Sequence, residues 1–354
     1  MVSFSLTAPR MLEQLEPPSR WTVATIAIYA IGAILIILAG LRPIIARMRA
    51  QGGLDSKTIK RRNLLEALYR AWLIAGQTAL ITFGYGQWVA NTLGAYHIPL
   101  LEKIVLMVPF CLIIITGWAL DYRFHLAIRT INAPSGDHTP HYWSRRSHIL
   151  YNIRHNLLFT IAPIGLILLL SDIVEFYVLP ATPHDAQEAV YLTTSLGGAL
   201  VVFLISPLLI TRIWKTRSLE PGELRSDLET LCGTLKLKYR DILVWETEGV
   251  IANAAVMGLI APFRFILMSD GILHRLERHH IKAVFAHEGG HITSKHLPYL
   301  MMMAIATMTL CATATDFAAE YFELTEISAG ILMFALLLTV GGFLFGAVSR
   351  QFER

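Results

Sequence analysis

The residues that could carry out chemistry are concentrated in the run Ala286-His287-Glu288-Gly289-Gly290-His291. On a helix, two histidines four residues apart lie on one face, so both imidazoles can bind one metal ion with Glu288 beside it. Neutral imidazoles suit zinc, and a nearby carboxylate can take a proton from a water molecule that attacks a carbonyl. The spacing therefore predicts a Zn²⁺ site that includes His287 and His291, with Glu288 as the catalytic general base. Because the chain has thirteen histidines, a chance pair is the alternative that the surrounding sequence must exclude.

The residues before this motif are compatible with one helix. Ile281, Val284 and Phe285 form an apolar stripe that can bury the helix against a core. The two glycines of the motif are unexpected there, because each costs about 1 kcal/mol relative to alanine inside a helix. We therefore expect a neighbouring helix or a substrate to approach this backbone closely.

The composition indicates a membrane protein. Of 354 residues, 54% are hydrophobic and only 16% are charged, and the mean hydropathy is +0.52. We predict a mainly α, polytopic membrane protein with about seven transmembrane helices and a small α+β catalytic region at the cytoplasmic face. The expected spans are 21–41, 71–89, 104–120, 157–179, 189–213, 297–314 and 327–348.

The distribution of charge predicts the orientation in the membrane. The connection 42–70 carries eight lysines and arginines against Asp55 and Glu66, so by the positive-inside rule it stays in the cytoplasm. Alternating the spans from there places the N-terminus outside and the motif on the cytoplasmic side, at the cell membrane if the source is bacterial. The basic loops are expected to contact membrane lipids, and nucleic-acid binding is not expected.

Two polar features lie in or beside the predicted spans. Span four carries Asp172 and Glu175, which either point into a protein or water-filled interior or mark the end of the span at the interface. The loop 121–156 is rich in histidine. A second metal site is conceivable there, but aromatic and cationic residues at a membrane interface explain its composition adequately. Its histidines are His125, His138, His141, His148 and His155.

After the fifth span the sequence becomes less apolar. Leucines at 224, 228, 231 and 235 predict a helix, and strand-like runs follow at 241–247 and 263–268, with 253–258 between them. Ser269-Asp270-Gly271 then predicts the start of the next helical segment. The predicted domains are an external segment 1–20, a five-span domain 21–213, a catalytic α+β region 214–296, and a final part 297–354 with two further spans.

A catalytic zinc site needs three protein ligands, and the motif supplies two. Glu353, at the end of the last span, emerges on the same side of the membrane as His287 and His291 when spans and charges are counted. It is the candidate third ligand.

The sequence also resembles a known family over about residues 219–354. The matching runs are Asn253-Ala254 with Gly258, residues 266–273, the motif with His296, and Ser349-Arg350 with Glu353. Together they resemble the membrane zinc metallopeptidases that include the type I CAAX prenyl proteases and the HtpX-type quality-control proteases. The resemblance implies zinc held by His287, His291 and Glu353, Glu288 as general base, and a strand at Asn253-Ala254 that binds substrate backbone.

The sequence departs from this family in two ways. Relatives usually have a bulky apolar residue where Gly289 stands, and they continue after Glu353 through an Ala-Asp pair and an oxyanion-stabilising histidine or arginine. We therefore expect that a longer protein has been truncated. The leading hypothesis is a membrane-embedded zinc metalloendopeptidase that uses a zinc-activated water to cleave membrane-associated polypeptides, either prenylated tails or damaged membrane proteins.

The main alternative is a catalytically impaired metallopeptidase fold acting as a sensor or scaffold in the membrane. An intramembrane protease is disfavoured because Arg275, Arg278 and Lys282 flank the motif. A transporter is disfavoured because no broken-helix pair or internal repeat is visible. The oligomeric state stays open.

Overall fold

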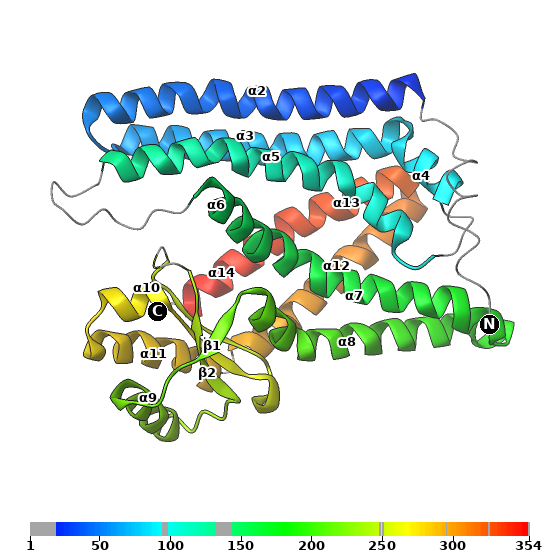
Figure 1. The fold of residues 1–354 in the computed structure, drawn as a ribbon. Helices are drawn as coiled ribbons and strands as arrows, with labels where there is room; N and C mark the ends of the chain where they lie inside the picture. Colours follow the sequence, from blue (N-terminus) through cyan, green and yellow to red (C-terminus); the bar gives the residue numbers. More distant parts are fainter. Residues whose placement is uncertain are drawn as a thin grey trace, which may run out of the picture. The chain divides into compact units, whose positions relative to one another are not determined.

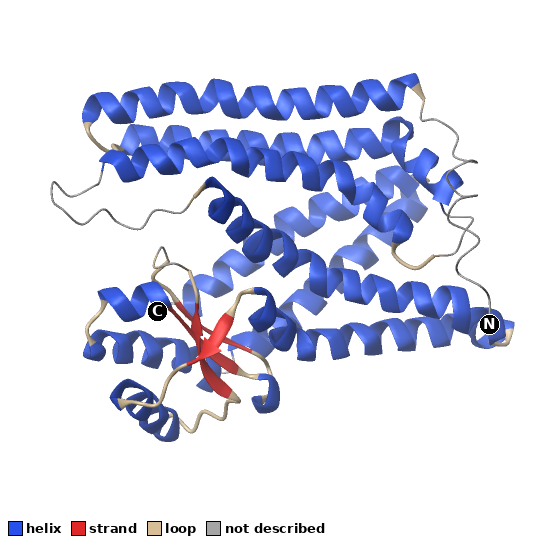
Figure 2. Cartoon of the chain, viewed as in Figure 1, coloured by secondary structure: helices blue, strands red, loops and turns tan. Residues whose placement is uncertain are grey.

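The computed structural model describes residues 19–93, 98–131, 144–247, 249, 251–294, 296–324 and 326–352. The chain is mainly helical with one small sheet, as predicted (Figure 2). It divides into two compact units, Met1–Phe203 and Leu204–Arg354. Each unit is described by itself below.

The first unit is built from helices. They are α2 (Arg20–Gln51), α3 (Ser56–Leu80), α4 (Gly86–Leu93), α5 (Leu101–Ile131), α6 (Arg145–Asn152), α7 (Phe159–Ile173) and the first part of α8 (Gln187–Ile213). Short π-helical and 3₁₀-helical segments join several of them, namely Ile81–Tyr85, Ile153–Leu158, Val174–Val178, Leu179–Ala181 and His184–Ala186. Helices α2, α3 and α5 lie side by side (Figure 1).

Hydrogen bonds between side chains and backbone carbonyls connect these three long helices. The Tyr29 hydroxyl donates to the Leu73 carbonyl at 2.9 Å, and Trp72 Nε1 donates to the Tyr29 carbonyl at 3.0 Å. Gln77 Nε2 donates to the Leu106 carbonyl at 2.8 Å. Such bonds can hold apolar helices together where the hydrophobic effect gives little preference for one neighbour over another.

Six helices of the described residues are long and apolar enough to cross a membrane. They are Arg20–Gln51, Leu101–Ile128, Arg145–Ala181, His184–Ile213, Pro298–Phe322 and Ser328–Val348. Each contains or closely overlaps one of the predicted spans. The remaining predicted span, 71–89, is divided among α3, the segment Ile81–Tyr85 and α4. Gly84 adopts a left-handed φ of 102° there and breaks the helix direction.

The second unit surrounds a four-stranded sheet. Its elements are β1 (Thr216–Ser218), α9 (Glu223–Thr234), β2 (Asp241–Trp245), β3 (Ala254–Met257), β4 (Phe265–Ser269), α10 (Asp270–Arg275), α11 (Arg278–Thr293), α12 (His296–Phe322), α13 (Glu326–Leu336) and α14 (Gly342–Phe352), with a π-helical segment at Leu337–Gly341. The strand order is β1-β2-β4-β3. Strands β2 and β4 are parallel, and the other two pairs are antiparallel.

The core of the second unit confirms the predicted leucine stripe and its helix. Leu228 of α9 is fully buried, and Ile281 and Phe285 of α11 join it in one apolar cluster with residues of β2 and β4. The sequence reasoning missed β1, because three residues carry no usable periodicity.

Candidate active site

The motif lies on one uninterrupted helix, α11. Its continuity puts positions 287 and 291 on the same helix face, one turn apart. His287 is exposed, and Glu288 is half-buried. Only the backbone is described at His291, and Glu353 lies outside the described residues. The predicted three-ligand set therefore stays a prediction, while the helix that should carry two of its members is present.

The two glycines of the motif have different surroundings. A Cβ atom added at Gly289 would lie 2.8 Å from Leu235 Cδ1, at the end of α9. At Gly290 nothing lies within 4 Å of such an atom in the structure. The close approach expected from the sequence is therefore found at Gly289, and its source is the leucine stripe of α9.

Ion pairs fix the first turn of α11 to α9. Arg278 Nε lies 2.6 Å from Asp227 Oδ2, and the same guanidinium pairs with Glu223. Lys282 Nζ lies 3.5 Å from Asp227 Oδ2. The Arg278 hydrogen bond, with smaller contributions from the charges of Arg278 and Lys282, lowers the pKa of Asp227. These contacts tie the motif helix to the helix that carries Leu235.

Strand β3, which begins at the predicted substrate-binding run, lies at the edge of the sheet. Ala254 is buried and pairs with Met268 of β4, whereas Asn253 is exposed. Ser269 forms hydrogen bonds with both backbone groups of Asn253. The Asn253 amide donates to Ser269 Oγ at 2.9 Å, and the Asn253 carbonyl accepts from the Ser269 amide at 2.9 Å. Helix α11 packs beside β3. In the described part of the chain, β3 pairs on one side only.

Asp270 is a positioning residue that the sequence reasoning did not single out. Its Oδ2 accepts hydrogen bonds from the amides of Thr247 and Gly249, each at 3.0 Å. Its Oδ1 accepts from the Thr247 hydroxyl at 2.5 Å and from the Gly271 amide at 2.8 Å. One carboxylate thus joins the end of β2 to the start of α10. In the sequence, the Ser269-Asp270-Gly271 run predicts the start of a helix but does not by itself indicate the partners of Asp270.

Two glycines near this strand are required by its geometry. Gly258, just after β3, has a φ of 108°, and a Cβ there would collide with the Phe263 carbonyl. A Cβ at Gly271 would collide with the Ile251 carbonyl. Both collisions involve backbone atoms, which cannot move aside as a side chain can.

A second group near the motif could also bind a metal ion. Glu277, His279 and His280 stand together at the start of α11, and all three are exposed. His279 Nδ1 lies 3.3 Å from Glu277 Oε2. Because exposed donors of this kind remain hydrated, we do not assign them a catalytic role.

Comparison with known proteins identifies the second unit. Residues 218–354 match peptidase family M48. The match begins within β1 and includes the sheet, the motif helix and the last spans. It confirms the resemblance to the membrane zinc metallopeptidases of the CAAX prenyl protease and HtpX type that the sequence motifs indicated.

Two curated proteins similar to this chain are each described as "Protease HtpX homolog". The protein from Aeropyrum pernix is 29% identical over 120 residues, which is 33% of this chain and 36% of that protein. The protein from Thermoplasma acidophilum is 26% identical over 161 residues, which is 44% of this chain and 50% of that protein. The chain therefore spans half or less of the length of these relatives.

A solved structure is similar over nearly the whole chain. The crystal structure of S. mikatae Ste24p superposes with a TM-score of 0.52 at 16% identity, covering 96% of this chain and 87% of that one. At this identity the likeness shows the fold. Together with the six candidate spans, it supports the predicted multi-pass membrane architecture.

Proposed function

We propose that the chain is a membrane-embedded zinc metalloendopeptidase. The observation that carries the proposal is the coincidence of the M48 match with the motif on one continuous helix, α11, beside an edge strand. The helix that carries Glu288 packs beside an edge strand that could bind an extended peptide. The metalloprotease class rests on the family, and the zinc and endopeptidase assignments rest on the residues.

The proposed zinc ligands are His287, His291 and Glu353. Two imidazoles and a carboxylate are a donor set that catalytic zinc uses, and the four-residue spacing on α11 fits the two imidazoles. When bound, zinc would polarise the scissile carbonyl and make a water molecule more acidic.

Glu288 is the proposed general base. Its carboxylate accepts a proton from the attacking water and then passes that proton to the leaving amine. A half-buried position suits this role, because the side chain can reach solvent while the helix holds it in place. A positioned acid–base group contributes about 100-fold to 10,000-fold in rate.

Strand β3 is the proposed substrate platform. A peptide that adds as a further strand beside Asn253 and Ala254 would gain backbone hydrogen bonds without a requirement for particular side chains. The contacts of Ser269 with both backbone groups of Asn253 hold the start of this platform fixed. Such binding suits a peptidase whose substrates are extended segments.

The proposed substrates are membrane-associated polypeptides. The positive-inside pattern favours a cytoplasmic active site, and membrane lipids are the expected surroundings of the spans. Prenylated tails and damaged membrane proteins are both compatible with this location.

The test is the substitution Glu288→Gln in the full chain, purified in detergent. We expect zinc content to stay at the wild-type level while cleavage of a membrane-associated test polypeptide falls by at least about 100-fold. Glu320→Gln, on an exposed position of α12, is the matched control and should keep full activity. Turnover retained by Glu288→Gln would refute the mechanism. A folded chain whose zinc content is unchanged by His287→Ala would favour the sensor or scaffold.

A further inference from the structure

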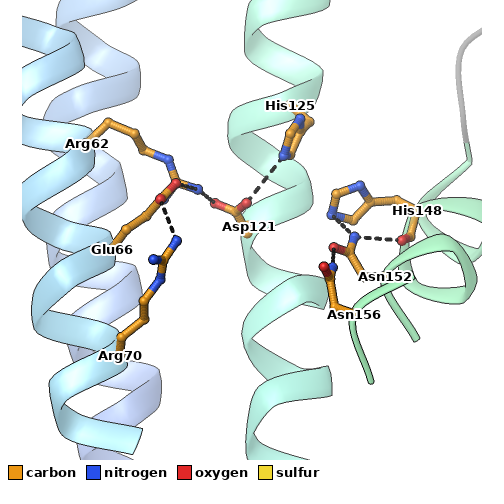
Figure 3. Close-up of polar contacts among 8 residues, drawn as sticks. All are labelled: Arg62, Glu66, Arg70, Asp121, His125, His148, Asn152 and Asn156. Atoms are coloured by element: carbon orange, nitrogen blue, oxygen red, sulfur yellow. Dashed lines mark hydrogen bonds and ion pairs between the residues drawn. The ribbon is translucent and has the colours of Figure 1, made fainter. Parts of the chain in front are cut away.

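The first unit contains a polar cavity between its helices. Its volume is about 460 Å³, and its walls come from α2, α3, α5, α6 and the π-helical segment after α6. Figure 3 shows the polar side chains that meet there. Two of them, Asp121 and His125, lie within the apolar helix Leu101–Ile128, which is a candidate span. Ionisable residues in such helices are costly and generally serve a function.

Three side chains in this cavity are grouped closely enough to bind one metal ion. Asp121 and His125 stand four residues apart on α5, and His148 approaches from α6 (Figure 3). One ligand atom from each residue lies within 4.8 Å of the other two. His148 is buried, Asp121 is largely enclosed, and His125 is partly open to the cavity. Two of the three side chains are therefore shielded from solvent, and an ion could reach the group from the side of His125.

The separations are close to those that a bound ion imposes. His125 Nε2 lies 3.3 Å from Asp121 Oδ2. In tetrahedral coordination with bonds of about 2.0–2.1 Å, neighbouring ligand atoms lie about 3.3–3.4 Å apart. This pair already has that spacing. The third ligand would need to approach by at most about 1.5 Å relative to the 4.8 Å bound.

The surrounding residues orient the carboxylate as metal sites require. Arg62 Nη2 lies 2.8 Å from Asp121 Oδ1, which leaves Oδ2 directed toward His125. Glu66 in turn pairs with Arg62 at 3.0 Å and offsets its charge. Ligating carboxylates generally have such partners on their second oxygen.

The buried histidine is also held by its neighbours. Asn152 Nδ2 donates to the His148 carbonyl at 2.9 Å and lies 3.4 Å from His148 Nε2. Asn156 Nδ2 donates to Asn152 Oδ1 at 2.9 Å. The 3.4 Å contact is at the long end of hydrogen-bond distances.

We propose that Asp121, His125 and His148 bind a divalent transition-metal ion that links α5 to α6. Two imidazoles and one carboxylate suit Zn²⁺ or Fe²⁺ and are a poor match for Mg²⁺, which prefers oxygen ligands. The ion would stabilise the first unit by cross-linking the consecutive helices α5 and α6. It is independent of the catalytic zinc proposed for the second unit.

The test begins from a chain in which the motif imidazoles are removed, His287→Ala with His291→Ala. This full chain, stripped of metal in detergent, is titrated separately with Zn²⁺, Fe²⁺ under anaerobic conditions, and Mg²⁺. We expect one tightly bound Zn²⁺ or Fe²⁺ per chain and no uptake of Mg²⁺. The bound ion should also raise the unfolding temperature.

Adding His148→Ala to this background should remove that ion, and Asp121→Asn should weaken binding at least tenfold. The matched control is His184→Ala, an exposed histidine before α8, which should leave binding unchanged. If His148→Ala fails to fold, His125→Ala on the open side of the cavity is the second variant. The result to compare is the difference in bound metal between the background chain and each variant, because the exposed histidines of α11 can bind zinc weakly in all of them.

Two results would overturn the proposal: no tight ion in the background chain, or equal metal content with and without His148 and His125. Either result leaves the catalytic assignment untouched, since the motif histidines are already absent. Conversely, loss of proteolysis in Glu288→Gln has no bearing on the metal content of the first unit.

Discussion

Asp270 should tolerate even an isosteric substitution poorly. All four of its partners present a hydrogen to the carboxylate: the amides of Thr247, Gly249 and Gly271, and the Thr247 hydroxyl. A carboxylate is an acceptor at both oxygens, whereas an asparagine amide must present two N–H donors at one of the two positions. Asp270→Asn therefore keeps the shape of the side chain and removes part of its hydrogen bonding.

The less damaging orientation of the amide places its nitrogen at the Oδ1 position. The bond from the Gly271 amide is then lost, and the Thr247 hydroxyl must turn from donor to acceptor. The two amide bonds at the other oxygen remain, but they weaken because their acceptor has lost its charge. Hydrogen bonds to charged groups contribute about 1.5–3 kcal/mol and neutral ones about 1 kcal/mol, so the local cost is at least about 2 kcal/mol.

Hydrogen exchange measures this cost where it arises. The amides of Thr247 and Gly249 should exchange about 30-fold faster in Asp270→Asn, since about 1.4 kcal/mol corresponds to a factor of ten. Asp185→Asn, at an exposed position, is the matched control and should leave these rates unchanged. Wild-type protection of Thr247 and Gly249 in Asp270→Asn would refute the assignment of Asp270 as the anchor of this loop.

Two further predictions concern α11. Gly290→Ala should stabilise the second unit by about 0.5–1 kcal/mol, because an alanine there meets open space. Gly289→Ala should stabilise it less, because its methyl group must displace Leu235. Denaturant unfolding of both variants measures the difference in stability. The lowered pKa of Asp227 means that its pairing with Arg278 is fully present above the ordinary aspartate pKa of about 3.9 and is lost as the pH falls through the folded value. The acid-unfolding curves of wild type and Asp227→Asn should therefore differ near neutral pH and converge at low pH, and parallel curves would contradict this.

The sequence predicted the elements whose patterns repeat over several turns. Helix α9 and the motif helix α11 were found from apolar stripes, and Leu228, Ile281 and Phe285 indeed lie in one core. Strands β2 and β4 were predicted to within a few residues. The spans were found from long apolar runs. Each of these signals sums many small contributions of one kind, so a single contrary residue does little harm.

Elements that depend on one residue or on distant partners were not predictable in this way. The helix break near Gly84 depends on one left-handed backbone angle. For both Asp172 and Glu175, the sequence allowed either a position in a protein interior or one at the end of the span. The structure shows that the two residues differ. Asp172 is buried and accepts from Lys103 Nζ at 2.7 Å and from the Leu100 amide at 2.9 Å, whereas Glu175 is exposed. Nothing in the apolar run around them encodes a partner some seventy residues earlier.

In the candidate active site, the residues proposed to do the chemistry were predictable from the sequence, whereas the residues that position them were not. Residue types and spacing predict His287, His291 and Glu288 as site residues, because the reaction itself limits which side chains can serve. The residues that hold α11 and β3 in place are chemically ordinary, and only their contacts reveal them.

These positioning contacts come from two stretches of the second unit. Asp227 pairs with the first turn of α11 and Leu235 packs close to Gly289, while Ser269 and Asp270 hold the start of β3 and the loop before it. The motif helix and the proposed substrate strand thus share one local scaffold within the second unit. A change in that scaffold should therefore alter the position of the proposed general base relative to a bound peptide while leaving the proposed metal ligands unchanged. In the proposed enzyme, Asp270→Asn should lower the rate of cleavage without lowering zinc content, which distinguishes a positioning residue from a ligand.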